Sequence, residues 1–373
     1  MVRAAVLPAV GQPLEVRDDI EVDDPHPGEV QVRIAASGVC HSDLSARAGV
    51  MLMPTPVVLG HEGAGVVERV GEGVTRIRPG DRVLVSWVPQ CGTCYFCERR
   101  QGHLCEKATI TLAAGGLLDG TTRLRSGGLP LHQMAASGTF AELTVVPETG
   151  VVKLPDDLDL TLAALLGCSV LTGVGAALNT ARVAPGDTVA VVGCGGVGLN
   201  VVQGARIAGA ARIIAVDTNP AKLALAEAFG ATDAVDASSA DAVSGVMALT
   251  AQRGADVAFE VVGVQRTIDQ AITMTRRGGQ AVLVGVPAMD ATVSVPAFFG
   301  LVLSGKTISG CWYGSSNIHE DVPRLIRLYR AGRLDLDRLV SRTIGLDEVD
   351  AALDALGTGD LARSVVVHGA PQP

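Results

Sequence analysis

Apolar and polar positions follow two different patterns along the chain. From residue 2 to about residue 85, short β-prone runs such as 30–34 and 66–70 are separated by Gly and Pro. Runs of this kind predict strands of a partly antiparallel region. The stretch from Cys91 to about Gly138 is rich in glycine and polar residues. We therefore expect a long ordered excursion of the chain, a loop that requires an additional interaction to hold it in place.

A second pattern, in which apolar strands alternate with helices, begins near residue 171. The expected elements are a strand at 188–192, a helix to about residue 209, a strand at 212–216, a helix at 221–229, and strands at 257–261 and 281–284. Continuously apolar strands that alternate with helices indicate a parallel, doubly wound sheet.

The pattern changes again after Cys311, with helices expected at 321–331 and 346–356 and a last strand at 364–368. The chain is therefore expected to leave its first domain, build the second and return. We place the first domain at residues 1–170, the second at 171–311, and the return to the first at 312–373.

Composition supports two domains of the α/β class. A chain of 373 residues exceeds one ordinary hydrophobic core. Its 45 glycines and its aromatic content of only 3% favour closely packed strand-helix units over an antiparallel sandwich.

Charge and hydropathy argue against two classes of partner. A formal charge of −9 without a basic run disfavours nucleic acid. The N-terminus lacks the features of a secretory signal, so we expect a cytoplasmic protein. Residues 161–180 are as long as a bilayer span, but Gly167, Gly173 and Gly175 interrupt them, and no membrane role is expected.

Four of the eight cysteines, Cys91, Cys94, Cys97 and Cys105, lie close together, separated by two, two and seven residues. Such spacing lets four thiolates converge on one ion and leaves no open position for substrate. A structural zinc site in the loop 91–105 is therefore predicted. Disulfides and an iron-sulfur cluster are the alternatives, and the long polar loop favours zinc.

A second metal site is suggested by Cys40, His61 and Cys168. A catalytic zinc takes three protein ligands from separate parts of a fold and keeps a fourth position open. Each of the three alone is a weak signal, because a lone Cys or His is more often a packed core residue.

A glycine loop, whose members are Gly193, Gly195, Gly196, Val197 and Gly198, follows a predicted strand and opens a helix. This context predicts binding of a dinucleotide pyrophosphate at the helix N-terminus. The alternative is a glycine turn that only packs helix on strand. Asp217 ends the next strand, where a carboxylate binds the ribose hydroxyls and repels a 2′-phosphate, so NAD is favoured over NADP.

Taken together, these motifs resemble the zinc-containing medium-chain alcohol dehydrogenases, in order and over essentially the whole chain. The resemblance is greatest to the branch with the thiol-dependent formaldehyde dehydrogenases and the long-loop dimeric enzymes. It implies a GroES-like, partly antiparallel β catalytic domain plus a Rossmann doubly wound parallel-sheet domain. It also implies NAD, two Zn²⁺ per subunit (one catalytic, one structural) and a homodimer.

The resemblance assigns roles residue by residue. Cys40, His61 and Cys168 match the catalytic zinc ligands, with Glu62 beside the metal and Asp43 orienting His61. Simple solvation of a loop is the alternative for Glu62 and Asp43. The remaining cofactor-binding positions are His41, Thr172, Lys222, Val284 and Arg363.

The family mechanism implies that Ser42 receives the alcohol proton. Many members carry a histidine at the end of the proton relay, where this chain has Ser45, so we expect a relay that ends in solvent. Trp87 and Met53 are the expected substrate-pocket residues. Residues 50–53 and Thr109 replace the acidic residues and the arginine with which relatives bind the glutathione adduct. This replacement favours primary alcohols or aldehydes with an apolar or aromatic tail, interconverted by hydride transfer.

Three other functions stay open at this point. The first is a thiol-dependent formaldehyde dehydrogenase or S-nitrosothiol reductase. The second is a nicotinoprotein that holds NAD permanently, and the third, least favoured, is a non-enzymatic zinc or redox sensor. Cys194, inside the glycine loop, is interpreted as a small filler, a side chain that only occupies space in the loop. Its oxidation would nevertheless crowd the pyrophosphate.

Overall fold

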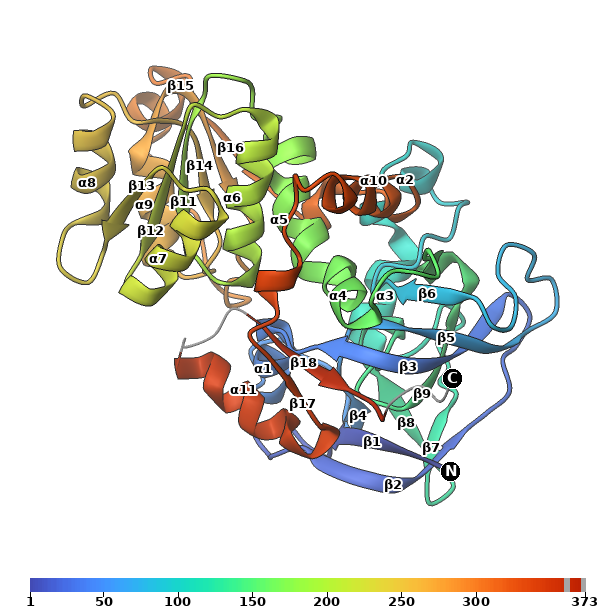
Figure 1. Ribbon diagram of the computed structural model, residues 1–373. Coiled ribbons are helices and arrows are strands. Elements are labelled where there is room, and N and C mark those ends of the chain that lie inside the picture. Colours follow the sequence, from blue (N-terminus) through green and yellow to red (C-terminus); the bar gives the residue numbers. More distant parts are fainter. Residues whose placement is uncertain (359–362, 370–373) are drawn as a thin grey trace. The chain divides into compact units, whose positions relative to one another are not determined.

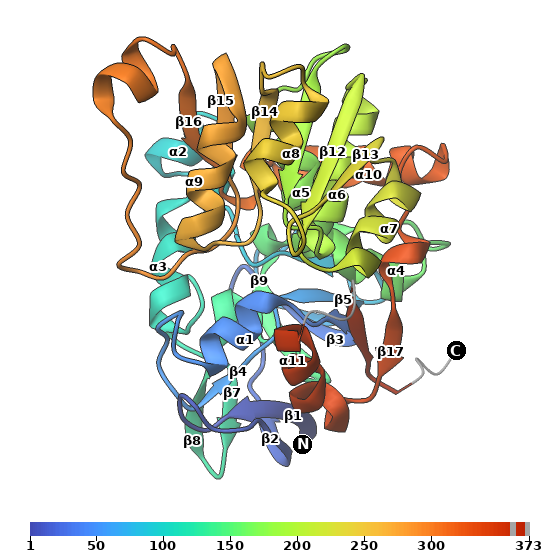
Figure 2. The same ribbon diagram turned by 90° about the vertical axis from the view of Figure 1, so that its left-hand side faces the viewer.

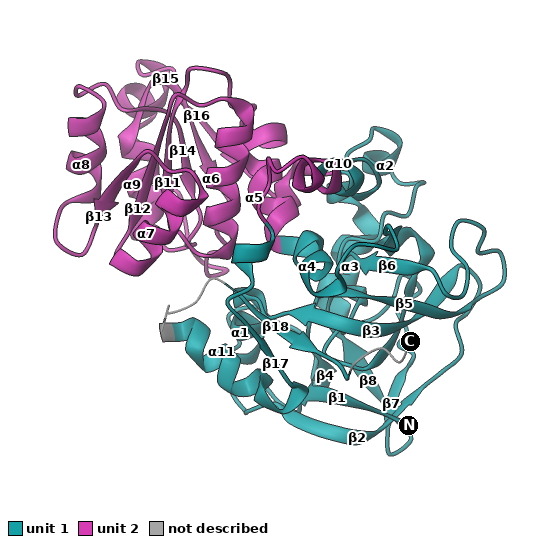
Figure 3. Ribbon diagram, in the orientation of Figure 1, with its two compact units in different colours: residues 1–168, 317–325, 336–373 teal, residues 169–316, 326–335 magenta. Residues whose placement is uncertain are grey.

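The computed structural model describes residues 1–358 and 363–369. The chain forms two compact units, shown in Figure 3. Unit 1 consists of residues 1–168, 317–325 and 336–373, and unit 2 of residues 169–316 and 326–335. Each unit is therefore assembled from segments that are distant in sequence.

Unit 1 is built on a closed barrel and a larger sheet (Figure 1). The barrel has the order β1 (Val2–Leu7), β2 (Glu15–Val22), β7 (Leu124–Ser126), β8 (Leu129–Gln133) and β4 (Val57–Val58). The sheet has the order β10 (Val151–Lys153), β6 (Arg82–Val85), β5 (Glu62–Val70), β3 (Glu29–Gly38), β18 (Ser364–Val367) and β17 (Arg342–Ile344), and β9 (Leu143–Pro147) also pairs with β3.

Strands β3 and β5 position the first candidate metal ligands. Their alternating apolar side chains, among them Val30, Val32 and Val67, lie in one buried cluster, which selects the register of the pair. In that antiparallel register Gly38, the last residue of β3, pairs with Glu62, the first of β5. The residues just beyond these two strand ends are consequently brought close together.

The predicted excursion from Cys91 to about Gly138 contains more regular structure than the sequence indicated. It includes α2 (Tyr95–Glu98), η1 (Gly102–Leu104), α3 (Glu106–Ala114) and the hairpin β7–β8. Leu124 and Leu131 of the hairpin pack with Val6 and Ile20 in the barrel core. Strands this short carry too few alternating positions to be recognised in the sequence.

The described part of unit 1 contains four further α-helices. They are α1 (His41–Arg47), α4 (Leu160–Leu165), which packs on β3 and β5, the first half of α10 (Ile318–Arg330), and α11 (Val349–Thr358), which contacts α1.

Unit 2 contains a six-stranded sheet in which every pair is parallel. Its order is β13 (Asp233–Asp236), β12 (Arg212–Asp217), β11 (Thr188–Val192), β14 (Ala255–Glu260), β15 (Thr275–Leu283) and β16 (Thr307–Gly310). The predicted doubly wound parallel sheet is confirmed. All five residues of β11 are buried, as expected for a central strand that helices cover on both faces.

Four helices of unit 2 lie side by side in two pairs. They are α6 (Gly196–Ala208) beside α7 (Pro220–Phe229), and α8 (Ala242–Leu249) beside α9 (Gln265–Met274), which lies in front of the strands in Figure 2. Helix α5 (Leu171–Gly175) packs on α6 of the first pair. Strand order changes direction between β11 and β14. The loops after these two strands therefore diverge at the carboxyl edge, where sheets of this kind bind nucleotides in a crevice.

One helical stretch, Leu160–Thr180, is long and apolar enough to cross a membrane. It runs through α4, the π-helical turns η4 (Leu166–Val170) and η5 (Ala176–Thr180), and α5 (Leu171–Gly175). Because 83% of its apolar window is buried inside the protein, this stretch has the burial of a core helix.

Candidate active site

Unit 1 brings together four buried side chains that could hold a metal ion. The ligand atoms of Cys40, His61, Glu62 and Cys168 all lie within 4.8 Å of one another. Cys40 follows β3 and His61 precedes β5, so the register of these strands joins them, whereas Cys168 comes from η4. Two thiols, an imidazole and a carboxylate in one buried cluster match the donors that zinc prefers.

Asp43 organises two of these candidate ligands from a fully buried position. Its carboxylate accepts hydrogen bonds from the backbone N–H of Cys40 (2.9 Å) and of Gly60 (3.1 Å). The same carboxylate lies 3.2 Å from Nδ1 of His61. An Nδ1–H that donates to Asp43 leaves Nε2 of His61 free to bind a metal.

Glu62 forms an ion pair with Arg363 inside the protein. Nη2 of Arg363 lies 3.1 Å from Oε1 of Glu62, and Nη1 donates to the carbonyl of Val39 (3.0 Å). Burial raises the pKa of Glu62 to about 8, although the charge of Arg363 opposes the shift. The described side-chain contacts of Arg363 are thus with residues around the candidate metal cluster, and its pyrophosphate contact stays a prediction.

Gly38 is required beside Glu62, and the sequence analysis missed it. A Cβ at position 38 would lie 2.2 Å from Oε2 of Glu62. Only glycine leaves room for the carboxylate at this point of the β3–β5 pair. A glycine two residues before a candidate metal ligand was the available signal.

The thiols of Cys40 and Cys168 interact directly. A hydrogen bond from the Cys168 thiol holds the pKa of Cys40 well below its ordinary value, although burial opposes this shift. Arg363 and His61 act in the same direction through their positive charges. A lowered thiol pKa favours the thiolate, the form in which cysteine binds metals.

The predicted catalytic and pocket residues differ in their distance from this cluster. Oγ of Ser42 lies 3.8 Å from Sγ of Cys40. The ring of Trp87 meets that of His61 edge to face, with centroids 6.3 Å apart. Ser45 and Met53 are half-buried, and the carbonyl of Ser45 accepts hydrogen bonds from the N–H groups of residues 50 and 51.

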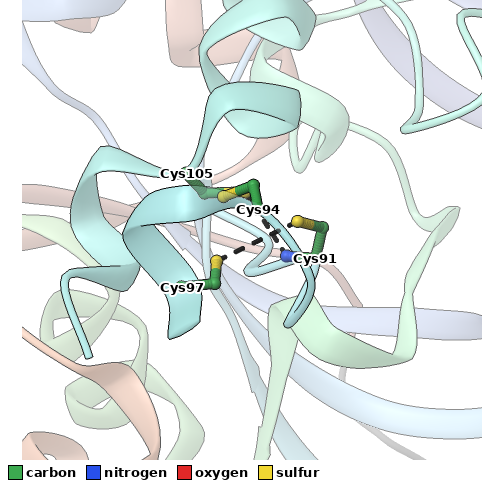
Figure 4. Close-up of side chains that lie close together, drawn as sticks. All are labelled: Cys91, Cys94, Cys97 and Cys105. Atoms are coloured by element: carbon green, nitrogen blue, oxygen red, sulfur yellow. Dashed lines mark hydrogen bonds between the residues drawn. The ribbon is translucent and has the colours of Figure 1, made fainter. Parts of the chain in front are cut away.

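The cysteine quartet also converges, as Figure 4 shows. Its sulfur atoms all lie within 4.8 Å of one another, and those of Cys91 and Cys97 are 4.0 Å apart. Tetrahedral zinc with Zn–S bonds of about 2.3 Å needs sulfur atoms roughly 3.8 Å apart. Although burial opposes it, hydrogen bonds from Thr93 lower the pKa of Cys91 to about 6. The four residues fit a closed metal site.

A third group, His26, Glu29 and Asp119, also meets the distance criterion for a metal site. The buried guanidinium of Arg123 lies between its two carboxylates, 2.6 Å from Glu29 and 2.7 Å from Asp119. Because this cation already compensates both carboxylates, we interpret the group as an ion network around Arg123, with Glu29 buried and His26 and Asp119 exposed.

The glycine loop of unit 2 has the geometry of a phosphate-binding turn. Gly193 has a φ of +96°, and a Cβ on Gly198 would lie 1.9 Å from the carbonyl oxygen of Gly193. No atom lies within 4 Å of the Cβ position of Gly195, the residue that caps α6. The loop is therefore tight on its inner side and open at the helix N-terminus, where backbone N–H groups bind anions.

Asp217 lies beside this loop at the end of β12. Its carboxylate accepts hydrogen bonds from the backbone N–H of Cys194 (2.8 Å) and of Asn219 (2.9 Å). Burial raises the pKa of the Cys194 thiol to about 12, so this cysteine lacks the thiolate that oxidation requires. The filler interpretation of Cys194 is favoured.

The other predicted cofactor residues lie in both units. Lys222 and Thr172 are half-buried in α7 and α5, and Val284 is buried just after β15. In unit 1, His41 is exposed at the start of α1, and Arg363 is buried just before β18.

Two family models match the chain. The alcohol dehydrogenase GroES-like domain matches residues 26–156, and the zinc-binding dehydrogenase domain matches residues 196–331. An S-(hydroxymethyl)glutathione dehydrogenase of Escherichia coli O1:K1 is 41% identical over 367 residues, 98% of this chain and 99% of the relative.

Solved structures show the same architecture. An alcohol dehydrogenase zinc-binding domain protein from Burkholderia ambifaria superposes with a TM-score of 0.93 at 36% identity, covering 100% of this chain and 99% of the other. Benzyl alcohol dehydrogenase from Acinetobacter calcoaceticus superposes with a TM-score of 0.92 at 31% identity, covering 98% and 99%. The predicted combination of a GroES-like domain and a Rossmann-type domain is confirmed.

Proposed function

Because the chain belongs to the zinc-dependent alcohol dehydrogenase family, we propose that it interconverts primary alcohols and aldehydes with apolar or aromatic tails, using NAD. The observation that carries this proposal is the buried cluster of Cys40, His61 and Cys168. Ser42 and Trp87 lie directly beside this cluster, where a proton acceptor and a pocket wall are needed.

Two zinc ions per subunit are part of the proposal. Cys40, His61 and Cys168 would hold the catalytic ion, and Glu62 lies close enough to replace one of them as a ligand. The cysteine quartet would hold the structural ion. A catalytic zinc supplies positive charge that favours the deprotonated form of a bound alcohol. Asp43 keeps His61 in the tautomer that such a site requires.

Ser42 is proposed to receive the proton of the alcohol. Its hydroxyl is half-buried next to Cys40, whereas the described contacts of Ser45 are those of its backbone carbonyl. A serine hydroxyl is no base near neutral pH. We therefore propose that Ser42 accepts the proton of the alcohol while it gives up its own, and that no protein base at position 45 ends the relay.

NAD is favoured over NADP because of Asp217. A carboxylate at the end of β12 suits ribose hydroxyls and repels a 2′-phosphate. Lys222 is proposed to contact the same ribose, and Thr172 and Val284 to lie around the nicotinamide. His41 and Arg363 are proposed to approach the pyrophosphate.

Apolar side chains near the pocket residues support an apolar or aromatic substrate. Leu52, next to Met53, is 67% exposed, and Ile110, next to Thr109, is 65% exposed. Pro54 packs against the end of α3, which carries Thr109 and Ile110, so these two segments are neighbours. The structural similarity to a benzyl alcohol dehydrogenase agrees with an aromatic tail.

A thiol adduct of formaldehyde is the second candidate substrate. It is supported by the 41% identity to an S-(hydroxymethyl)glutathione dehydrogenase. Against it stand Thr109, whose hydroxyl is committed to the carbonyl of Cys105 (3.0 Å), and the apolar residues 50–53. Neither Thr109 nor residues 50–53 offer a cation for the carboxylates of glutathione.

A cytoplasmic homodimer completes the proposal. In the described part of unit 2, β16 pairs only with β15 and is an edge strand. The nearby turn η6 (Ala297–Val302) exposes Phe298 (59%), Phe299 (72%) and Val302 (74%). An exposed apolar patch beside an unpaired edge suits association of two subunits.

A substrate panel tests the proposed function. Zinc-loaded protein would be assayed with NAD or NADP against benzyl alcohol, ethanol and S-(hydroxymethyl)glutathione. We expect the highest kcat/KM with benzyl alcohol and NAD. A clear preference for the glutathione adduct would replace the first candidate by the second.

Absorbance of the purified protein near the reduced-nicotinamide band, before any cofactor is added, tests whether NAD is exchangeable. Exchangeable NAD leaves no such band after dialysis. A persistent band, together with turnover that requires an external electron acceptor, would support a nicotinoprotein.

A further inference from the structure

Glu260, at the end of β14, is a fully buried carboxylate that none of the roles above uses. Its Oε1 accepts hydrogen bonds from the N–H of Val262 (2.8 Å), the N–H of Gly263 (2.7 Å) and the hydroxyl of Thr267 (2.6 Å). One oxygen thus joins the strand end, the following turn 261–264 and the first turns of α9. Hydrogen bonds to a charged acceptor are about twice as strong as neutral ones.

The turn 261–264 packs closely against two neighbouring loops at glycine positions. A Cβ on Gly193, in the glycine loop, would lie 2.6 Å from the side chain of Val262. On the other side, Gly263 has a φ of +88°, and a Cβ there would lie 2.6 Å from the carbonyl oxygen of Val286. A Cβ on Gly285 would lie 2.2 Å from the amide nitrogen of Gly263. The turn is therefore packed between the glycine loop and the end of β15.

Sheet order indicates which part of the cofactor this turn serves. Strand β14 lies on the opposite side of β11 from β12, which carries Asp217. If Asp217 binds the adenosine ribose and the loop after β11 binds the pyrophosphate, the nicotinamide half extends over β14 and β15. Val284, proposed to lie near the nicotinamide, donates its N–H to the carbonyl of Glu260 (2.8 Å).

We propose that Glu260 is a positioning residue for the nicotinamide half of NAD. It acts by holding the turn 261–264 as a fixed wall of the crevice, and its own carboxylate is too deeply buried to touch the cofactor. This inference rests on the proposed NAD-linked function. Rate depends on such a wall because small misplacements of the reacting atoms are costly to hydride transfer.

The test compares catalysis with binding of AMP, which carries only the adenosine half of NAD. Glu260→Ala is expected to lower kcat about tenfold or more, while the Kd of AMP changes less than about twofold. Glu260→Gln should recover part of kcat, because its side-chain oxygen still accepts hydrogen bonds. If Glu260→Ala prevents folding, Thr267→Val serves as the test instead. It removes one of the three donors and should lower kcat by about two- to threefold.

Glu227→Gln, an exposed glutamate of α7, is the matched control and should leave both quantities unchanged. Equal losses of kcat and AMP affinity in Glu260→Ala would overturn the proposal, as would unchanged kcat in both Glu260→Ala and Thr267→Val. If the wild-type protein binds NAD but oxidises no alcohol, the proposed alcohol dehydrogenase activity is wrong, and the role of Glu260 is still open to test. The ratio of NAD to AMP affinity, expected to fall in Glu260→Ala, would then decide the role of Glu260.

Discussion

The backbone N–H of Cys194 donates a hydrogen bond of 2.8 Å to the carboxylate of Asp217. Asp217, which is proposed to determine the preference for NAD over NADP, therefore also fixes the backbone of the second residue of the glycine loop. Adenosine recognition and loop geometry depend on the same side chain, and a substitution at Asp217 is expected to affect both.

Asp217→Ala should raise the KM for NAD about tenfold or more and reduce the preference over NADP, because the variant loses the ribose contact and the repulsion of a 2′-phosphate. Asp217→Asn should be milder for NAD, since one oxygen remains to accept from the loop. Steady-state kinetics with both cofactors measure this. Asp236→Asn, at the end of the neighbouring strand β13, is the control. An unchanged cofactor ratio in Asp217→Ala would contradict the assignment.

Asp43→Asn is expected to weaken the catalytic metal site specifically. The variant loses the carboxylate that orients His61 and weakens the acceptor for the N–H groups of Cys40 and Gly60. Loss of such a supporting group typically lowers metal affinity about 10- to 100-fold. Competition with a chelator, followed by zinc content, should show one ion lost early and one retained. Asp24→Asn, on the surface, should behave like the wild type, and simultaneous loss of both ions from Asp43→Asn would argue against a local effect.

Ser42→Ala and Ser45→Ala should differ strongly. Loss of a group that takes part in proton transfer typically costs about 10²- to 10⁴-fold in rate, and we expect a loss in this range for Ser42→Ala. Ser45→Ala should keep kcat within about twofold and leave its pH profile unchanged. The pH dependence of kcat for both variants is the measurement. If Ser45→Ala alters that profile as much as Ser42→Ala does, the relay has a step at Ser45.

His368 should make the stability of unit 1 depend on pH. Burial lowers the pKa of this histidine from 6.5 to about 4, and Nε2 lies 3.2 Å from the carbonyl oxygen of Thr139. At a pH between about 4 and 6.5, His368 is protonated in the unfolded chain and neutral in the folded chain. The stabilisation, about 3 kcal/mol, is therefore fully present above pH 6.5 and is lost as the pH falls toward 4.

His368→Gln removes this ionisation and keeps a donor for Thr139. Relative to the wild type, its free energy of unfolding should rise by about 2 kcal/mol between pH 7 and pH 5. Urea unfolding at several pH values and constant zinc concentration measures the difference. His26→Gln, at an exposed position, should keep the wild-type slope. A parallel pH dependence of His368→Gln and the wild type would exclude His368 as the cause.

Those parts of the fold and site that depend on neighbours in sequence could be predicted from the sequence. Continuous apolar runs predicted the buried strands β11 and β12, because a strand covered on both faces needs apolar side chains at every position. The spacing from Cys91 to Cys105 predicted a converging cluster, because a short loop can bring its own thiols together. The hairpin β7–β8 was missed because its strands are too short to show a period.

Contacts between distant segments were decided by the tertiary structure. The register that pairs Gly38 with Glu62 brings Cys40 to His61, and a helix more than a hundred residues later adds Cys168. The family resemblance named these residues, but their spacing alone could not, because loop length leaves the separation of two strand ends undetermined. The pair Arg363–Glu62 depends in the same way on which backbones pack together. Residue types and their spacing are given by the sequence. The burial of a charged group and the identity of its partners are determined only when the chain folds.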